Sequence, residues 1–430
     1  MGFKDACAAW RSLRGCGFVA LSGPALLFMV HNRLGGGVKR RPLHPPLRSR
    51  PGLYFRSGMK QTYMMRTCNV IRLIRFTVGI LLLSPVVSQA QAAFTSFQVF
   101  GDGLSATTNG PGGSSYYGKR NSNGRVWVEV LAQRQGLTLY PTNNWSYFGN
   151  TSTSMVVSVS SFTPPSGVSM SSILFVIWVN NADLFYPALN NDSSMNVWTN
   201  TINLSLSNHF KAITNLYAKG ARTLIMPNAV DLSTIPKFNY FANTAFIHQR
   251  CLDYNVGFTN ILNLARTNSN YPGLTIYMPD FFTLLTNLIA YPTNYGVINA
   301  LFEGLSIDVI EDPTLSNKTT NGPGTNYIFW DANDPSAKAH AVMADIAKQL
   351  VSPVQITNFT VLNGSNRLDV ANVPIGLNGF VEGCTNLVLT NWTTKASFNS
   401  TNVTQTVFVP ASGSPQLFYR LQFPYAWSWP

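Results

Sequence analysis

The chain has 430 residues, with 30 Lys and Arg against 17 Asp and Glu, which gives a formal net charge of +13. Fourteen of the basic residues and only one acidic residue lie in the first 92 positions, so residues 93–430 carry sixteen charges of each sign. A main body without excess positive charge argues against binding to nucleic acid, which depends on neutralising phosphates.

Residues 64–92 have the three parts of a secretory signal peptide. A basic stretch that ends at Arg75 precedes the apolar run 76–87, and small residues up to Ala92 follow it in A-x-A spacing. The apolar run is shorter than the about 20 residues that a membrane-spanning helix needs. We therefore expect cleavage after Ala92, no stable membrane span afterwards, and a secreted, periplasmic or cell-surface protein of bacterial type.

Residues 1–63 are rich in Arg and Pro and show no sustained periodicity. A signal peptide should begin a chain, so we interpret this segment as a mis-called extension of the reading frame, with the true start at Met64 or Met65. The alternative is a disordered basic arm that contacts a membrane or nucleic acid.

From residue 93 to 352, short apolar runs alternate with longer segments of helical periodicity. The runs resemble parallel strands that are buried on both faces, and they cover 96–100, 173–179, 223–226 and 274–278. The helical segments cover 125–134, 197–219, 241–266 and 337–350. The alternation predicts an α/β domain with helices on both faces of a parallel sheet. Ligands of such domains bind beyond the carboxyl ends of the strands.

After residue 352 the pattern changes to short alternating runs separated by Asn, Gly and Pro. These runs are 356–362, 386–390, 404–409 and 417–423, and they predict a small antiparallel β domain over 353–430. Four aromatic residues of this segment could stack on sugars or fill a thin core, namely Trp392, Tyr425, Trp427 and Trp429. A surface protein that binds carbohydrate through this domain is therefore one functional alternative.

The segment after the first predicted strand, Phe100-Gly-Asp-Gly-Leu-Ser-Ala, resembles the F-G-D-S-L-S-D block of the SGNH (GDSL) ester hydrolases. Three further blocks follow in the family's order. Residues 144–151 resemble N-x-A-x-G-G-A-T, residues 178–185 resemble W-x-G-x-N-D, and residues 329–336 resemble F-W-D-x-x-H-P-T. The resemblance implies a three-layer αβα sandwich with a parallel sheet, of the SGNH or flavodoxin-like kind, over residues 93–352.

Three catalytic positions of the family carry other residues in this chain. Gly103 stands at the position of the nucleophilic serine, Ala182 at that of the oxyanion-hole asparagine, and Asp334 at that of the histidine. The resemblance makes Asp331 the acid of the triad and leaves Gly149 as a backbone donor of the oxyanion hole. Asp183 is also kept, whereas Asn181 precedes the asparagine position and its side chain should point the other way along an extended chain.

Loss of both the hydroxyl and the imidazole should remove ordinary serine catalysis, because the nucleophile needs a base within hydrogen-bond reach. We therefore predict a non-catalytic or feeble esterase homologue without a cofactor or metal, whose pocket keeps a small-molecule or glycan ester ligand. The alternative is an active carboxylesterase or lipase in which Ser105 replaces the nucleophile. His340 would face away from position 334 on its helix, and His209 and His248 are interpreted as structural.

Four aspartates lie in loops at one edge of the expected sheet: Asp102, Asp183, Asp331 and Asp334. Clustered carboxylates raise one another's pKa values. They could bind Ca²⁺ or Mg²⁺ or act as an acid/base pair on a glycosidic bond. We expect instead that Asp102 and Asp331 accept backbone N–H groups and stabilise the fold. Neither the oligomeric state nor the identity of the ligand follows from the sequence.

Overall fold

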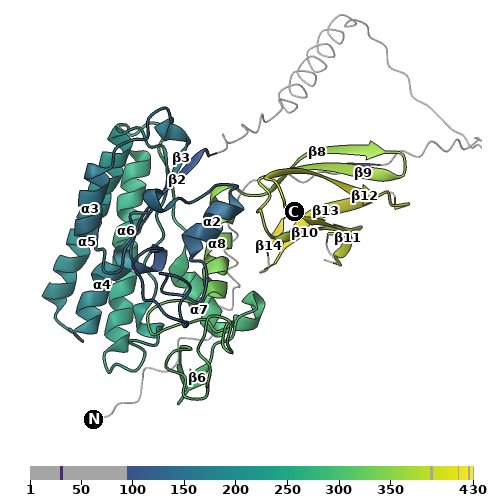
Figure 1. The fold of residues 1–430 in the computed structure, drawn as a ribbon. Coiled ribbons are helices and arrows are strands. Elements are labelled where there is room, and N and C mark those ends of the chain that lie inside the picture. The colour runs from purple at the N-terminus through teal and green to yellow at the C-terminus, as the bar shows by residue number, and fades with distance from the viewer. Residues whose placement is uncertain (1–29, 32–93, 388–390, 415, 425–426, 430) are drawn as a thin grey trace, which may run out of the picture.

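The computed structural model describes residues 30–31, 94–387, 391–414, 416–424 and 427–429. An α/β domain is followed by a smaller β domain, as Figure 1 shows. The predicted signal peptide and nearly all of the predicted extension lie outside the described residues. Within the described residues, no helix is long and apolar enough to cross a membrane.

The central sheet of the α/β domain has four strands: β2 (Ser96–Gly101), β3 (Ile173–Trp178), β4 (Thr223–Ile225) and β5 (Thr275–Tyr277). They pair in the order β2-β3-β4-β5, and every pair is parallel. All six residues of β3 are buried, as the continuous apolar run predicted. Because the strands are parallel, their carboxyl ends meet at one edge, where Asp102 and Asn180 follow β2 and β3.

Helices cover both faces of this sheet (Figure 1). One layer contains α3 (Ser152–Ser161), α5 (Met195–Ala218) and α6 (Thr244–Thr267), with α4 (Asn180–Leu189) packed on α5. The other layer contains α2 (Trp127–Arg134), α7 (Phe281–Ala290) and α8 (Ala337–Val351), and α2 packs directly on α8. The three-layer αβα prediction is therefore confirmed.

Three buried aromatic side chains join the sheet to its second helix layer. The ring centroids of Trp127 and Trp178 are 5.5 Å apart, and each indole lies edge-to-face with Phe281, at 5.4 Å and 5.1 Å. Such pairs add about 0.5–1.5 kcal/mol each beyond the area that they bury. The cluster fixes α2 and α7 against β3, directly behind the edge at which the strands end.

The C-terminal domain consists of two antiparallel sheets. One contains β8 (Gln355–Leu362), β9 (Ser365–Ala371) and β12 (Thr404–Pro410). The other contains β1 (Val30–His31), β10 (Asn378–Cys384), β11 (Thr393–Asn399), β13 (Gln416–Phe423) and β14 (Trp427–Trp429). The Arg134 guanidinium links this domain to the first, because it pairs with Asp345 at 2.7 Å and donates to the Ile375 carbonyl at 2.9 Å.

Sequence and structure differ at several elements. Helices α3, α4 and α7 were not expected. The expected strand at 386–390 is not formed at its two described residues, because Asn386 has no regular structure and Leu387 lies in a turn. Residues 388–390 lie outside the described residues. Five serines and two threonines in or next to α3 hide its helical character, since these residues compete with the helix for backbone hydrogen bonds.

Candidate ligand pocket

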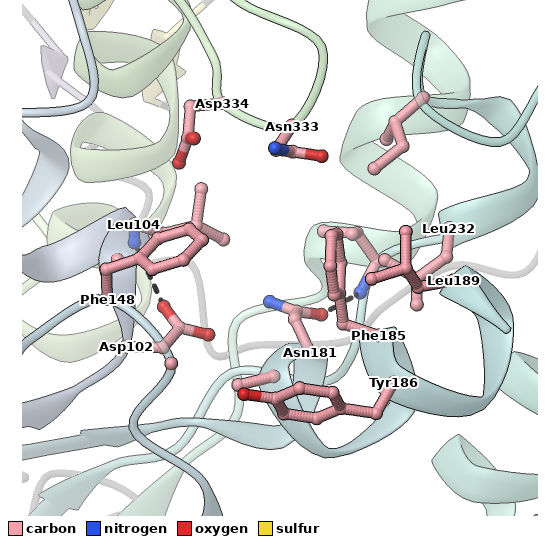
Figure 2. A pocket seen from close by; sticks show the side chains of 15 residues that line it. Asp102, Leu104, Phe148, Asn181, Phe185, Tyr186, Leu189, Leu232, Asn333 and Asp334 are labelled. Atoms are coloured by element: carbon pink, nitrogen blue, oxygen red, sulfur yellow. Dashed lines mark hydrogen bonds between the residues drawn. The ribbon is translucent and has the colours of Figure 1, made fainter. Parts of the chain in front are cut away.

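A cavity of about 230 Å³ opens at the carboxyl ends of the central strands (Figure 2). Most of its wall is apolar, and its polar side chains are few. The loop after β2, the loop before α3, helix α4, the loop after β4 and the loop before α8 all contribute. The lining residues are Asp102, Gly103, Leu104, Phe148, Gly149, Asn181, Ala182, Phe185, Tyr186, Leu189, Val230, Leu232, Ile235, Asn333 and Asp334.

Gly103 begins the short 3₁₀ helix η1 (Gly103–Ser105) and lies in the cavity wall. A Cβ atom on this glycine would lie 2.9 Å from Nδ2 of Asn121 and 3.1 Å from Cδ2 of Phe148. Phe148 occupies the position of the first glycine in the family pattern N-x-A-x-G-G-A-T. The place of a serine side chain is therefore filled by a phenyl ring and an amide.

Asn181 and Ala182 lie in the first turn of α4, where both line the cavity. The expectation that Asn181 points away is wrong, because α4 begins at Asn180 and the extended-chain argument does not apply inside a helix. The Asn181 side-chain oxygen accepts a hydrogen bond from the Val230 amide at 3.0 Å. Its Nδ2 has no hydrogen-bond partner among the described residues and lies on the side of Asp102 in Figure 2.

Asp102 caps η1, because its Oδ1 accepts a hydrogen bond from the Leu104 amide at 3.0 Å. The side chain is also part of the cavity wall. Burial raises the pKa of this carboxyl to about 7, and the charge of Asp183 acts in the same direction. Asp102 therefore combines the predicted fold-stabilising contact with a carboxyl group that titrates near neutrality.

Asp331 and Asp334 interact through their carboxyl groups in the loop before α8. Asp331 also accepts hydrogen bonds from the amides of Asn333 and Asp334 at 3.0 Å each, and from the Tyr116 hydroxyl at 3.1 Å. Burial raises the pKa of Asp331, and these donors oppose that rise. Burial and the charge of Asp331 raise the pKa of Asp334 well above its usual value, so Asp334 is the partner that keeps the proton.

Two further residues kept from the family pattern have different positions. Gly149 lines the cavity at φ +78°, a conformation that a side chain would strain. Asp183 lies behind the wall, where its Oδ1 accepts a hydrogen bond from the Ser152 amide at 3.0 Å and so caps α3. The four aspartates of the predicted acidic edge are thus split, and only Asp102 and Asp334 reach the cavity.

Ser105 is not among the lining residues of this cavity. It is fully buried, and its hydroxyl accepts a hydrogen bond from the Trp127 indole at 3.0 Å. His340 is buried next to the same tryptophan, where its Nδ1 accepts a hydrogen bond from the Trp127 backbone amide at 3.2 Å. Burial lowers the pKa of His340 to about 3. The structure therefore brings neither side chain to the pocket.

His209 and His248 also lie outside the cavity wall. His209 is buried in α5, with Nδ1 2.8 Å from the Ser205 carbonyl oxygen. His248 pairs through Nδ1 with Asp231, in the loop after β4, at 2.6 Å. In the described part of the chain, no group of three or more His, Cys, Asp or Glu side chains is arranged to hold a metal ion.

A smaller cavity of about 40 Å³ adjoins the first between α7 and α8. Its wall is almost wholly apolar and includes Trp178, Leu284 and Met343. The two cavities share four lining residues, namely Leu104, Val230, Ile235 and Asn333. Leu104 and Asn333 lie inside the blocks that carry the resemblance, at positions to which no role was assigned, whereas Val230, Ile235, Tyr116 and Asn121 lie outside the blocks and were missed by sequence reasoning.

The parallel sheet, the loops at its carboxyl edge and the four blocks define an α/β protein of the ester-hydrolase class. The family model of GDSL-like lipases and acylhydrolases matches residues 98–347, more than half of the chain. The chain belongs to this family.

Among curated relatives, a GDSL esterase/lipase of Arabidopsis thaliana is 29% identical over 142 residues, which are 31% of this chain and 40% of the relative. The thermolabile hemolysin of Vibrio parahaemolyticus is 22% identical over 270 residues, 57% of this chain and 61% of the relative. The chain thus spans between 40% and 61% of these two proteins. Among solved structures, the acetylxylan esterase Axe2 of Geobacillus stearothermophilus, as a catalytic mutant, is 12% identical with a TM-score of 0.36, over 60% of this chain and 95% of that one.

Proposed function

We propose that this family member keeps the pocket as a binding site for an ester or another acyl compound and lacks serine catalysis. The observation that carries the proposal is Gly103 at the serine position, where the side chains of Phe148 and Asn121 would have to shift to admit even a Cβ atom. A hydrolase of the usual kind needs a hydroxyl at this point. Catalysis in the family's usual manner is therefore absent or feeble.

The chemistry of the wall supports an acyl ligand. Apolar side chains surround most of the cavity and continue into the smaller cavity between α7 and α8. An alkyl chain would bury its surface there and gain about 25 cal/mol per Å². A carbonyl oxygen at the polar end would accept the unused N–H of Asn181. A small acylated carbohydrate would also match this wall if its acyl group entered the cavity ahead of the sugar.

The test is binding of a medium-chain methyl ketone, which has the carbonyl and the chain of an ester but cannot be hydrolysed. We expect quenching or enhancement of tryptophan fluorescence and a higher melting temperature of the full chain. The alkane of equal length should bind more weakly, because it leaves the Asn181 N–H without an acceptor. Val230→Phe should weaken binding of the ketone, since Val230 lines both cavities.

The matched control is Val256→Phe, which makes the same change at an exposed position of α6. Unchanged ketone affinity in both variants would contradict the proposal. So would labelling of the wild-type chain by a fluorophosphonate, which reacts with activated serines.

Export of the protein is a further part of this proposal. It is supported by the basic stretch, the apolar run 76–87 and the A-x-A spacing that ends at Ala92. Amino-terminal sequencing of protein from the culture medium or periplasm should begin at Ala93. A chain that stays in the cytoplasm with its first 92 residues intact would contradict export.

Carbohydrate binding by the C-terminal domain remains a separate proposal with less support. The ring of Trp392 is covered on one face by the Arg420 guanidinium, which lies 4.5 Å from the ring centroid and pairs with Glu382. A glycan array probed with the full chain and with Trp392→Ala should show loss of signal in the variant if this residue binds sugar.

A further inference from the structure

Three polar side chains of the apolar cavity are almost completely buried. Asp102 is 4% exposed, and Asn181 and Asp334 are 5% exposed each. They come from the ends of two neighbouring strands and from the loop before α8, and all three line the same cavity. Figure 2 shows Asp102 and Asp334 along one side of the cavity, with Asn181 beside Asp102.

The Asn181 amide has one end fixed and the other end free. The hydrogen bond from Val230 to its oxygen fixes the orientation of the amide and leaves Nδ2 on the side of Asp102, as Figure 2 shows. A buried N–H without an acceptor costs about 1–3 kcal/mol. No acceptor is present for it among the described residues. An acceptor oxygen of a bound molecule would remove this cost, so the side chain is placed as a donor to a ligand.

The two carboxyl groups of the cavity differ in the groups that stabilise their charged or protonated forms. Asp334 shares a proton with Asp331, whose ionised form accepts hydrogen bonds from Tyr116 and from two backbone amides. Asp102 accepts the Leu104 amide at 3.0 Å and interacts with the Ala182 amide, and it shares no proton with another carboxyl group. Asp334 is therefore kept as an acid, whereas Asp102 exchanges its proton near neutral pH. Two carboxyl groups of different protonation facing one cavity are the minimum set for general acid–base catalysis.

We propose that the pocket hydrolyses acyl esters by direct attack of water, with Asp102 as the base, Asp334 as the acid and Asn181 Nδ2 as the donor to the carbonyl oxygen. The proposal rests on the proposed function, because it requires that an acyl compound occupies this cavity. It needs no serine, histidine or metal ion.

The reaction balances with water as the only co-reactant. Ionised Asp102 takes a proton from water, and the water oxygen forms a bond to the carbonyl carbon while the carbonyl electrons move to oxygen. Asn181 Nδ2 donates to that oxygen. The carbon–oxygen bond of the alcohol then breaks, and Asp334 gives its proton to the departing oxygen. The products are a carboxylic acid and an alcohol, and the proton on Asp102 returns to the Asp331–Asp334 pair through solvent.

The test compares two butyrate esters, the p-nitrophenyl ester and the ethyl ester, with the full chain. The p-nitrophenolate ion leaves without a proton, whereas ethoxide needs one. Asp102→Asn should lower kcat for both esters by about 10²–10⁴-fold, the usual range for loss of a general acid or base. Asp334→Asn should lower kcat by a similar factor for the ethyl ester and far less for the p-nitrophenyl ester.

Asn181→Leu should lower kcat by about 10²–10³-fold with both esters, which is the usual effect of removing one oxyanion donor. Asp253→Asn is the matched control, since Asp253 is exposed on α6 and pairs with Arg250 away from the cavity. Its rates should equal those of the wild type. Asn at position 102 can still accept the Leu104 amide, so the fold should persist, and melting temperatures check this.

Rates of the wild type that equal buffer would overturn the proposal, as would an Asp102→Asn variant that keeps the wild-type rate. An acyl adduct on the intact chain, seen by mass spectrometry, would also overturn it, because direct attack of water forms none. If the methyl ketone still binds in that case, the pocket function stands and only the catalytic inference fails. If the ketone does not bind either, both proposals fail.

Discussion

The indole nitrogen of Trp127 lies 3.0 Å from the hydroxyl oxygen of Ser105 and donates a hydrogen bond to it. Both side chains are completely buried. Ser105 carries the first hydroxyl group after Gly103, which stands at the nucleophile position. Its hydrogen bond with Trp127 holds this hydroxyl behind the cavity wall. Its role as a substitute nucleophile is a prediction that this placement does not support.

We expect Ser105→Ala to lower the free energy of unfolding by about 1–3 kcal/mol, because the Trp127 N–H is left buried without an acceptor. Ester hydrolysis and ketone binding should be unchanged at temperatures where the variant is folded. Urea unfolding and initial rates measure the two effects. A variant of normal stability that has lost all hydrolysis would show that Ser105 reacts after all.

Restoring the missing serine should fail unless Phe148 is made smaller. In Gly103→Ser with Asp334→His, the new Cβ lies 3.1 Å from Cδ2 of Phe148 and 2.9 Å from Nδ2 of Asn121. Phe148 is 59% exposed and its ring can be removed at little cost to the core. We expect fluorophosphonate labelling only when Phe148→Gly is added to the two changes. Equal labelling with and without the third change would contradict the steric argument.

Asp102 should make stability depend on pH. Burial raises the pKa of Asp102 in the folded chain to about 7, against an ordinary value of 3.8. Between these values the folded chain holds a proton that the unfolded chain has lost, so the free energy of unfolding falls as pH rises from about 4 to about 7. One pKa unit corresponds to about 1.4 kcal/mol.

We expect Asp102→Asn to remove this dependence and to be more stable than the wild type at about pH 7, by a few kcal/mol at most. Urea unfolding at about pH 4 and about pH 7 gives the comparison, with Asp253→Asn as the control. A more stable but inactive variant is the combination expected of a catalytic carboxyl group. A less stable variant would show that Asp102 serves the fold alone.

Lys348 should give a dependence of the opposite sign. It is buried in α8, where Nζ donates to the Ser352 carbonyl at 3.2 Å, and burial lowers its pKa from 10.5 to about 7. Between these values the unfolded chain binds the extra proton, so stability rises with pH from about 7 to about 10. Lys348→Met should flatten this rise and stabilise the chain at about pH 7. Lys338→Met, on the same helix, is the control, and an unchanged slope in Lys348→Met would contradict the assignment.

The sheet could be predicted from the sequence because each strand is a nearly continuous apolar run, as in residues 173–178 of β3. The helices α5 and α6 also follow from periodicity over 24 residues each. Helix α7 could not be separated from a strand, because Phe281–Ala290 is apolar on nearly every side. Its first turn is capped locally by Asp280 and, in a contact across the fold that no local pattern marks, by Asn228.

The sequence indicates which motif residues form the pocket, but it does not indicate the directions in which their side chains point. Gly103, Asp102 and Asp334 lie in the wall as the blocks indicate, but Asp183 faces α3 and Ser105 faces Trp127. The direction of Asn181 depends on the residue at which α4 begins. Tyr116 reaches Asp331 from a loop more than 200 positions earlier in the chain, and no local pattern marks that contact.

The pairing of α2 with α8 has a consequence for the order of folding. Residues 127–134 meet their partner only when residues 337–351 are available, so this layer of the sandwich closes through one of the longest loops in the domain. Contacts so far apart in sequence form late and slowly. Until then Trp127 lacks α8, whose His340 accepts its backbone amide, and this layer has only α2 and α7. The other layer is built from segments closer together in the chain and can assemble first, so the pocket acquires Asp334, its last polar group, at the end of folding.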